Sequence, residues 1–341
     1  MDSTSPPRYL LIANPRTASN LLIRMLNISN QQNLISSDNL SGYYFMPIIE
    51  RIRELGIELS PPAEWSDDQV MQVKEKYQEC FRNLQSLLKK AEATQCSVFV
   101  KEHAIFLTML KTADSHSRFG SWTAVSLETW SNVSSSQSSN PTFLPDEFMR
   151  TWIPTFLIRH PALAFPSFYR AMKDNKTAPE LTDEATRLDG FWKQRFTLQG
   201  MRALYNWYIQ SPADRAQSPH SEDINTQWPV VMDADDIMTE PKLVQKYAQL
   251  VGMDPSLVTH TWEATSEDLK LRISPSFRRM LDTLLASKGI DMGKVAGNVD
   301  LDEESSKWRQ EFGETAGKVL GIFVMGAIPD YEYLKARRLR A

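Results

Sequence analysis

A polar turn near the start of the chain has the residue types of an anion-binding loop. Its sequence is NPRTASN (14–20), between a short apolar run and a helix-like repeat of Leu and Met. A loop that leads from a strand into a helix directs backbone N–H groups and the positive helix end toward one point. Arg16 would add a fixed charge, and Thr17, Ser19 and Asn20 would add side-chain donors. The pattern GxxxxGK[ST] is absent, so the loop differs from that of nucleoside triphosphatases.

Two residues that follow a second apolar run could take up a proton and neutralise a negative charge. Lys101 and His103 come directly after SVFV (97–100). A histidine can accept a proton from a hydroxyl near neutral pH. Lys101 lies two residues earlier and would point to the same side of an extended chain. The pair predicts a general base with a cationic helper, whereas a single histidine at a strand end is more often only a surface residue.

A third polar segment follows the apolar run TFLI (155–158). Arg159 comes directly after this run, Pro161 begins a turn, and Ser167 lies eight residues after the arginine. A guanidinium can hold a phosphate through two hydrogen bonds. Arg159 and Ser167 could therefore bind one phosphate from two sides, whereas the alternative for Arg159 alone is a structural ion pair.

The elements that position these residues alternate between strands and helices. Apolar runs at 9–12, 97–100, 155–158 and 228–232 read as buried strands, each followed by a polar turn or a helical repeat. This order predicts an α/β fold with a central, mainly parallel sheet flanked by helices. Ligands of such sheets bind beyond the carboxyl ends of the strands. We therefore expect the three polar segments to meet around one anionic ligand.

Composition bounds the function further. The 341 residues carry 38 Lys and Arg against 42 Asp and Glu, a net charge of −4, which disfavours a nucleic-acid-binding surface. We expect one domain over 1–341, with 112–146 as a loop or flap and 265–341 mainly helical. No apolar stretch is long enough for a membrane span. Two widely spaced cysteines, no export signal and no metal-ligand cluster predict a cytoplasmic protein without a metal.

The three segments together resemble the motifs of sulfotransferases. NPRTASNLL resembles their 5′-phosphosulfate loop, VFVKEHAIFL their strand that ends in Lys-x-His, and FLIRHPALAFPSFYR their 3′-phosphate motif. The order along the chain is also the same. The resemblance covers residues 8 to about 315, is nearest to a fungal group of secondary metabolism, and implies the P-loop NTPase-like sulfotransferase fold. It implies 3′-phosphoadenosine 5′-phosphosulfate as donor and 3′-phosphoadenosine 5′-phosphate as product.

Carried over by position, the resemblance implies a role for each motif residue. His103 would be the catalytic base, and Lys101 and Arg16 would neutralise charge on the transferring and leaving groups. The residues that would bind the donor are Arg16, Thr17, Ala18, Ser19, Asn20, Arg159, Ser167 and, in a later segment, Arg309. Ala18 stands where the family has glycine, so the resemblance implies a backbone less free to adopt positive φ.

The acceptor is expected to be a small molecule with a hydroxyl group. Aromatic residues near the motifs could form an apolar pocket, and Phe45, Phe106 and Tyr44 are the predicted lining. Two alternatives stay open at this point. The site could instead catalyse cyclisation or elimination of a diphosphate or activated alcohol, or the chain could be a catalytically silent nucleotide-binding protein. The long helices also leave room for a homodimer.

Overall fold

The computed structural model describes most of the chain. The described residues are 5–37, 42–60, 62–109, 140–174, 178–183, 191–210, 228–271, 273 and 275–340. The predicted flap at 112–146 lies outside them except for its last residues, from 140 onward.

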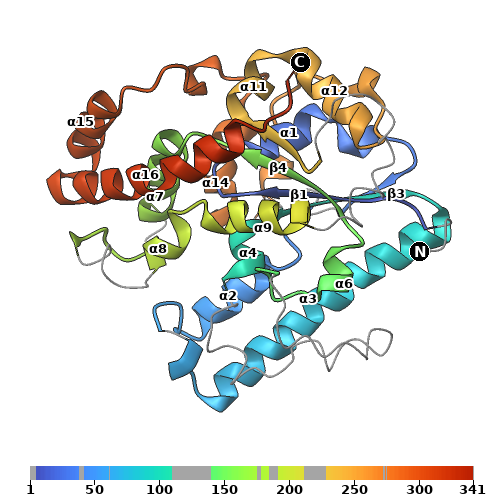
Figure 1. The fold of residues 1–341 in the computed structure, drawn as a ribbon, viewed down its shortest axis with the longest axis horizontal. Helices are drawn as coiled ribbons and strands as arrows, with labels where there is room; N and C mark the ends of the chain where they lie inside the picture. The colour runs from blue at the N-terminus through green and yellow to red at the C-terminus, as the bar shows by residue number, and fades with distance from the viewer. Residues whose placement is uncertain are drawn as a thin grey trace. The chain divides into compact units, whose positions relative to one another are not determined.

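A five-stranded sheet with the strand order β2-β3-β1-β4-β5 forms the centre of the fold (Figure 1). The strands are β1 (Arg8–Ala13), β2 (Leu34–Ile35), β3 (Ser97–His103), β4 (Ile153–Ile158) and β5 (Val230–Asp233). The β1–β3 and β2–β3 pairs are parallel, and Ala13 pairs in register with His103. Strands β1, β3, β4 and β5 are almost entirely buried, as continuous apolar runs in a covered parallel sheet should be. The predicted α/β fold is confirmed.

The domain comprises two compact units, and the first holds β1, β2, β3 and most of β4. Its helices are α2 (Met46–Glu54), α3 (Asp67–Thr94), α4 (Ala104–Thr108), α6 (Asp146–Met149) and α9 (Gln199–Gln210). The long helix α3 begins with a capping box, in which Ser66 and Gln69 satisfy each other's backbone N–H groups. It packs against α2, β2 and β3, while α4 continues directly from β3 and packs against α9. His103 therefore sits at the junction of β3 and α4.

The second unit holds the loop after β1, the end of β4 and most of β5. Its helices are α1 (Ser19–Met25), α7 (Pro161–Asp174), α8 (Phe191–Arg195), α11 (Ala234–Thr239), α12 (Pro241–Leu250), α13 (Glu267–Leu271), α14 (Pro275–Ala286), α15 (Leu301–Phe312) and α16 (Glu314–Lys335). Helices α15 and α16 form a hairpin, drawn in red in Figure 1, and α16 packs against α7. Short 3₁₀ turns connect several of these helices, including Met292–Lys294.

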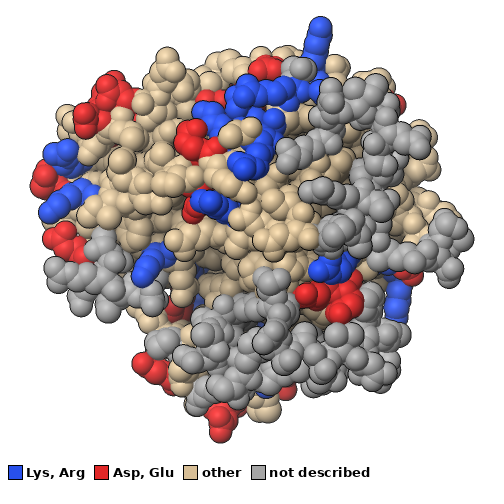
Figure 2. Space-filling model, viewed as in Figure 1, with Lys and Arg blue, Asp and Glu red and all other residues tan. Residues whose placement is uncertain are grey.

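The described surface carries both charge signs. On the face shown in Figure 2, Lys and Arg side chains are interspersed with Asp and Glu side chains. Helices with both the length and the apolarity needed to cross a bilayer do not occur among the described residues. Both cysteines are free thiols, with Cys80 buried inside α3.

Candidate functional site

The loop after β1 is held in shape by its own polar side chains. The Thr17 hydroxyl donates to the Asn14 carbonyl at 2.8 Å, and the Asn14 amide donates to the Thr197 carbonyl at 2.8 Å. Arg16 and Ala18 adopt the left-handed conformation, with φ of 67° and 63°. The substitution of alanine for glycine therefore does not prevent a positive φ at position 18. The left-handed conformation of a residue other than glycine costs about 1–2 kcal/mol. Backbone strain of this kind clusters at ligand-binding loops.

Arg16, Arg159 and Ser167 lie together in the second unit. Arg16 donates through Nε to the Ser167 hydroxyl at 2.9 Å and through Nη1 to the Met280 carbonyl. Arg159 donates through Nη1 to the Arg16 carbonyl at 3.1 Å and through Nη2 to the Lys294 carbonyl at 2.8 Å. The buried Nε of Arg159 has no hydrogen-bond partner within the described part of the chain. These guanidiniums are thus fixed in place, with a buried donor left for another group.

The remaining residues predicted to bind the donor lie in α1 and α15. Ser19 is buried and Asn20 is half-buried, and they are the first two residues of α1. Arg309 donates to the Ser305 hydroxyl at 3.1 Å, and its Nη1 lies 3.8 Å from Glu314. Arg309 is therefore held within the α15–α16 hairpin, and its predicted role with the donor stays a prediction.

Lys101 and His103 come together in the first unit at the end of β3. Both side chains are buried, and Tyr43 covers them. Its ring centroid lies 4.2 Å from the Lys101 ammonium and 4.9 Å from the His103 ring centroid. Phe106, one turn into α4, lies 5.2 Å from the His103 ring. The histidine therefore sits between two aromatic side chains beside a lysine.

The environment of β3 shifts the pKa of each of these groups. Burial and the adjacent Lys101 charge lower the pKa of His103 to about 3, although a hydrogen bond with the Ala13 backbone partly opposes this. The imidazole is therefore neutral near pH 7, the form that can accept a proton. Burial lowers the pKa of Lys101 and raises that of Glu102, because each charged form loses its hydration. The buried Nδ1 of His103 makes no hydrogen bond to a described residue.

Glu102 anchors the segment that carries Tyr43. Its side chain accepts a hydrogen bond from the Phe45 backbone N–H at 3.3 Å, and its Oε2 is buried without a described partner. Tyr43 donates its backbone N–H to the Lys101 carbonyl at 2.9 Å. Gly42 pairs with Lys101, and a Cβ there would lie 1.7 Å from the Lys101 oxygen. The sequence motifs do not predict this anchor. The one indication of it in the sequence is the carboxylate between Lys101 and His103 on an apolar strand.

Replacing Glu102 by glutamine should change how stability depends on pH. Burial raises the pKa of Glu102 to about 8, so between pH 4.5 and 8 the folded state keeps a proton that the unfolded state releases. The contribution of Glu102 to the stability of the wild type therefore falls as pH rises through this window. Glutamine has no such titration, so the free energy of unfolding of Glu102→Gln, relative to wild type, should rise by up to about 1.4 kcal/mol per pH unit.

Urea denaturation at pH 5 and pH 8 measures this difference. Glu54→Gln in α2 is the control, because it removes an exposed carboxylate and leaves the buried Glu102 in place. A Glu102→Gln profile that runs parallel to the wild-type profile would show that Glu102 is ionised in the folded state throughout this range.

The three predicted pocket residues have different environments. Phe106 is half-buried beside His103, and Tyr44 is also half-buried. Phe45 is only 1% exposed and packs against Tyr77 and Phe143, with ring centroids 6.2 and 5.4 Å away. Phe45 thus belongs to an aromatic core cluster, and Tyr43 lies nearer to His103.

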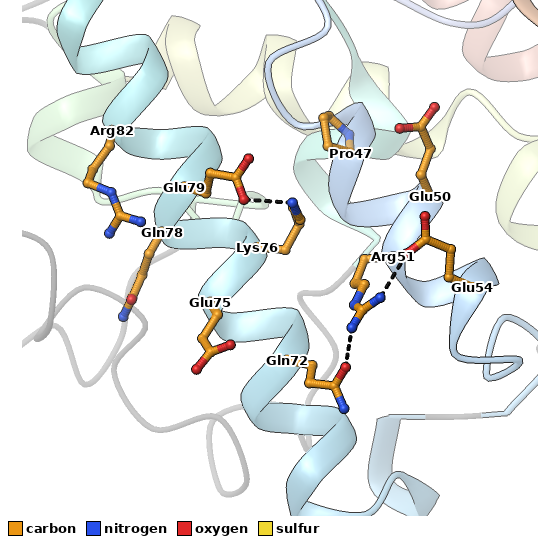
Figure 3. A pocket seen from close by; sticks show the side chains of 10 residues that line it. All are labelled: Pro47, Glu50, Arg51, Glu54, Gln72, Glu75, Lys76, Gln78, Glu79 and Arg82. Atoms are coloured by element: carbon orange, nitrogen blue, oxygen red, sulfur yellow. Dashed lines mark hydrogen bonds and ion pairs between the residues drawn. The ribbon is translucent and has the colours of Figure 1, made fainter. Parts of the chain in front are cut away.

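A separate groove lies between α2 and α3 and has a volume of about 610 Å³. In Figure 3, Arg51 reaches Glu54 and Gln72, while Lys76 pairs with Glu79. Its lining is charged, half-exposed and contains none of the predicted site residues. Exposed ion pairs of this kind contribute little to the free energy of folding. We therefore interpret the groove as a solvent-exposed gap between two helices.

Two fungal proteins match the chain over nearly its full length. Sulfotransferase ppzF of Metarhizium rileyi (strain RCEF 4871) is 40% identical over 343 residues, which cover 98% of this chain and 97% of that protein. Sulfotransferase ppzF of Metarhizium majus (strain ARSEF 297) is 40% identical over 342 residues, or 98% of each chain. No family model matches the chain.

Among solved structures, the sulfotransferase domain from the Synechococcus PCC 7002 olefin synthase matches with a TM-score of 0.38 and 13% identity, covering 92% of this chain and 97% of that one. The identity to the two fungal proteins confirms the resemblance to sulfotransferases. The chain belongs to the sulfotransferase family.

Proposed function

We propose that this protein transfers a sulfuryl group from 3′-phosphoadenosine 5′-phosphosulfate to a hydroxyl of a small apolar or aromatic natural product. The observation that carries the proposal is the arrangement at the end of β3. There the buried His103, whose Nδ1 has no hydrogen-bond partner among the described residues, lies beside Lys101 and two aromatic side chains. A scaffold or a plain nucleotide-binding protein does not need a histidine and a lysine placed together in this way.

The donor-binding residues proposed are those of the second unit. Arg159 and Ser167 would bind the 3′-phosphate, and Arg16, Thr17, Ala18, Ser19 and Asn20 the 5′-phosphosulfate. These residues suit such a ligand because the buried Nε of Arg159 has no partner in the described segments and because Arg16 donates to the Ser167 hydroxyl. Arg309 would assist from α15. When bound, the donor supplies the sulfuryl group and leaves as 3′-phosphoadenosine 5′-phosphate.

The residues of β3 and α4 would act on the acceptor. His103 would remove the proton from the acceptor hydroxyl, so that the oxygen becomes a better nucleophile. Lys101, held under the Tyr43 ring, would neutralise charge on the sulfuryl oxygens, and Arg16 would stabilise charge on the leaving phosphate. Preorganised donors of this kind contribute about 3–4 kcal/mol each to lowering a barrier. The half-buried Phe106 and Tyr44 would offer apolar surface to the acceptor, with Phe45 supporting them from the core.

Calorimetry with 3′-phosphoadenosine 5′-phosphate tests the proposal. We expect binding in the micromolar range or tighter, and we expect sulfated product by mass spectrometry when the phosphosulfate donor is incubated with simple phenols. A protein that binds no 3′-phosphoadenosine 5′-phosphate would overturn the donor assignment. In that case the same fold would serve a different reaction, such as ionisation of an activated alcohol.

A further inference from the structure

One aromatic residue of the first unit has a backbone conformation that its residue type seldom adopts. Tyr43 has a φ of 64°, in the left-handed region. This region is uncommon for a bulky residue, because its Cβ crowds the backbone. Strain of this kind persists only where the surrounding structure enforces it, and it often marks a functional position. The contacts of Tyr43 therefore indicate what its backbone is held in place for.

Strand β3 enforces this conformation at two points. The Tyr43 backbone N–H donates to the Lys101 carbonyl at 2.9 Å. The preceding Gly42 approaches the same carbonyl so closely that a Cβ would overlap its oxygen. Beyond Tyr43, the buried Glu102 side chain accepts the Phe45 backbone N–H at 3.3 Å. The segment is thus fixed to β3 both before and after Tyr43.

The ring of Tyr43 lies over the ammonium of Lys101. Its centroid is 4.2 Å from Nζ, inside the limit of about 6 Å within which a cation and an aromatic ring attract each other. Lys101 is fully buried, and this attraction is stronger where water is excluded. The same ring lies 4.9 Å from the His103 ring centroid. One side chain therefore contacts both residues proposed to act on the acceptor and the sulfuryl group.

We propose that Tyr43 is a positioning residue for sulfuryl transfer, whose ring holds the Lys101 ammonium beside His103. Glu102 would support it by securing the strained segment. This inference rests on the proposed function and adds a residue that lies outside the three motifs. A lysine has a flexible four-carbon stem, so a ring fixed over the ammonium preserves the alignment on which the rate depends. In this role Tyr43 acts through Lys101.

Three substitutions separate the ring from the backbone. Tyr43→Phe keeps the ring and should retain at least about half of the wild-type kcat with phenol as the acceptor. Tyr43→Leu removes the ring and should lower kcat about 10-fold, while binding of 3′-phosphoadenosine 5′-phosphate stays within about 2-fold of wild type. Tyr43→Asn also removes the ring, but asparagine tolerates a positive φ. It should therefore lose as much activity as Tyr43→Leu although its backbone is less strained.

A double-mutant cycle with Lys101→Met tests whether Tyr43 acts through Lys101. We expect Tyr43→Leu to lower kcat by less than about 2-fold in the Lys101→Met background, because the ammonium that the ring positions is gone. The same cycle in urea denaturation needs no turnover, and it should show coupling of about 3- to 30-fold in the unfolding equilibrium constant. Tyr333→Leu is the matched control, since it removes a ring 3.7 Å from the Arg337 guanidinium in α16. It should keep the wild-type kcat and show no coupling to Lys101→Met.

The outcomes separate this inference from the proposed function. If wild type transfers sulfuryl groups and the effects of Tyr43→Leu and Lys101→Met on kcat multiply, the positioning role is wrong while the proposed function stands. Full activity of Tyr43→Asn, or a loss in Tyr43→Phe as large as in Tyr43→Leu, would overturn the role of the ring. If wild type binds no 3′-phosphoadenosine 5′-phosphate and transfers no sulfuryl group, the proposed function fails. Coupling in urea denaturation would then still support the placement of Lys101 by Tyr43, and its absence would overturn it.

Discussion

Replacing His103 by alanine is expected to lower the rate of sulfuryl transfer by about 10²–10⁴-fold, the usual contribution of a general base. Binding of 3′-phosphoadenosine 5′-phosphate should stay within about 3-fold of wild type, because His103 belongs to the proposed acceptor side of the reaction. Single-turnover assays give the rate, and calorimetry gives the affinity. Together they separate a chemical defect from a binding defect.

A second readout and a control sharpen this expectation. Since burial and Lys101 lower the pKa of His103 to about 3, its neutral form persists at mildly acidic pH. The wild-type rate should therefore not fall between pH 8 and pH 6 through protonation of this histidine. His260→Ala, at a half-buried histidine in the second unit, should retain the wild-type rate. A His103→Ala enzyme with full activity would remove this residue from the mechanism.

The fold, and the positions of Arg16 and Arg159 just after strands, could be predicted from the sequence because the patterns that indicate them are local. Each central strand is a short apolar run that stops at a polar residue, and β1, β3, β4 and β5 all appear where such runs occur. Arg159 and Ser167 are eight residues apart, so the helix after the strand fixes their relation. The two-residue strand β2 carries no such pattern, and its pairing with β3 sets its position.

The contacts that prepare the site depend on tertiary structure and were harder to predict. Tyr43 was one of several aromatic residues near the motifs, and its place over Lys101 depends on the Gly42 pairing and on the Glu102 anchor. Lys294 lies 135 residues from Arg159 in a short turn without periodicity. Its position comes from hydrogen bonds to Asp291 and Asp235. Spacing along the chain contains none of this information.

The second large effect is expected for Arg159. Arg159→Ala should weaken binding of 3′-phosphoadenosine 5′-phosphate by at least about 30-fold, equivalent to about 2 kcal/mol, because it removes a buried charge from a phosphate ligand. Arg159→Lys should be only partly effective, since lysine keeps the charge but loses the planar set of donors. Ser167→Ala should cost less, about 2- to 10-fold, because it removes one neutral hydrogen-bonding group. Calorimetry ranks the three variants.

The structural role of Arg159 has to be separated from its role in binding. Its two hydrogen bonds to the Arg16 and Lys294 carbonyls also hold the loop after β1 and the Met292–Lys294 turn, so Arg159→Ala should lose stability as well as affinity. Lysine at this position retains the charge that the phosphate needs, and Arg53→Ala, on the exposed side of α2, controls for loss of a surface cation. If Arg159→Lys binds as weakly as Arg159→Ala, the fork of donors and not the charge determines affinity. If both bind as tightly as wild type, the 3′-phosphate lies elsewhere, and Arg159 serves only to hold the two loops together.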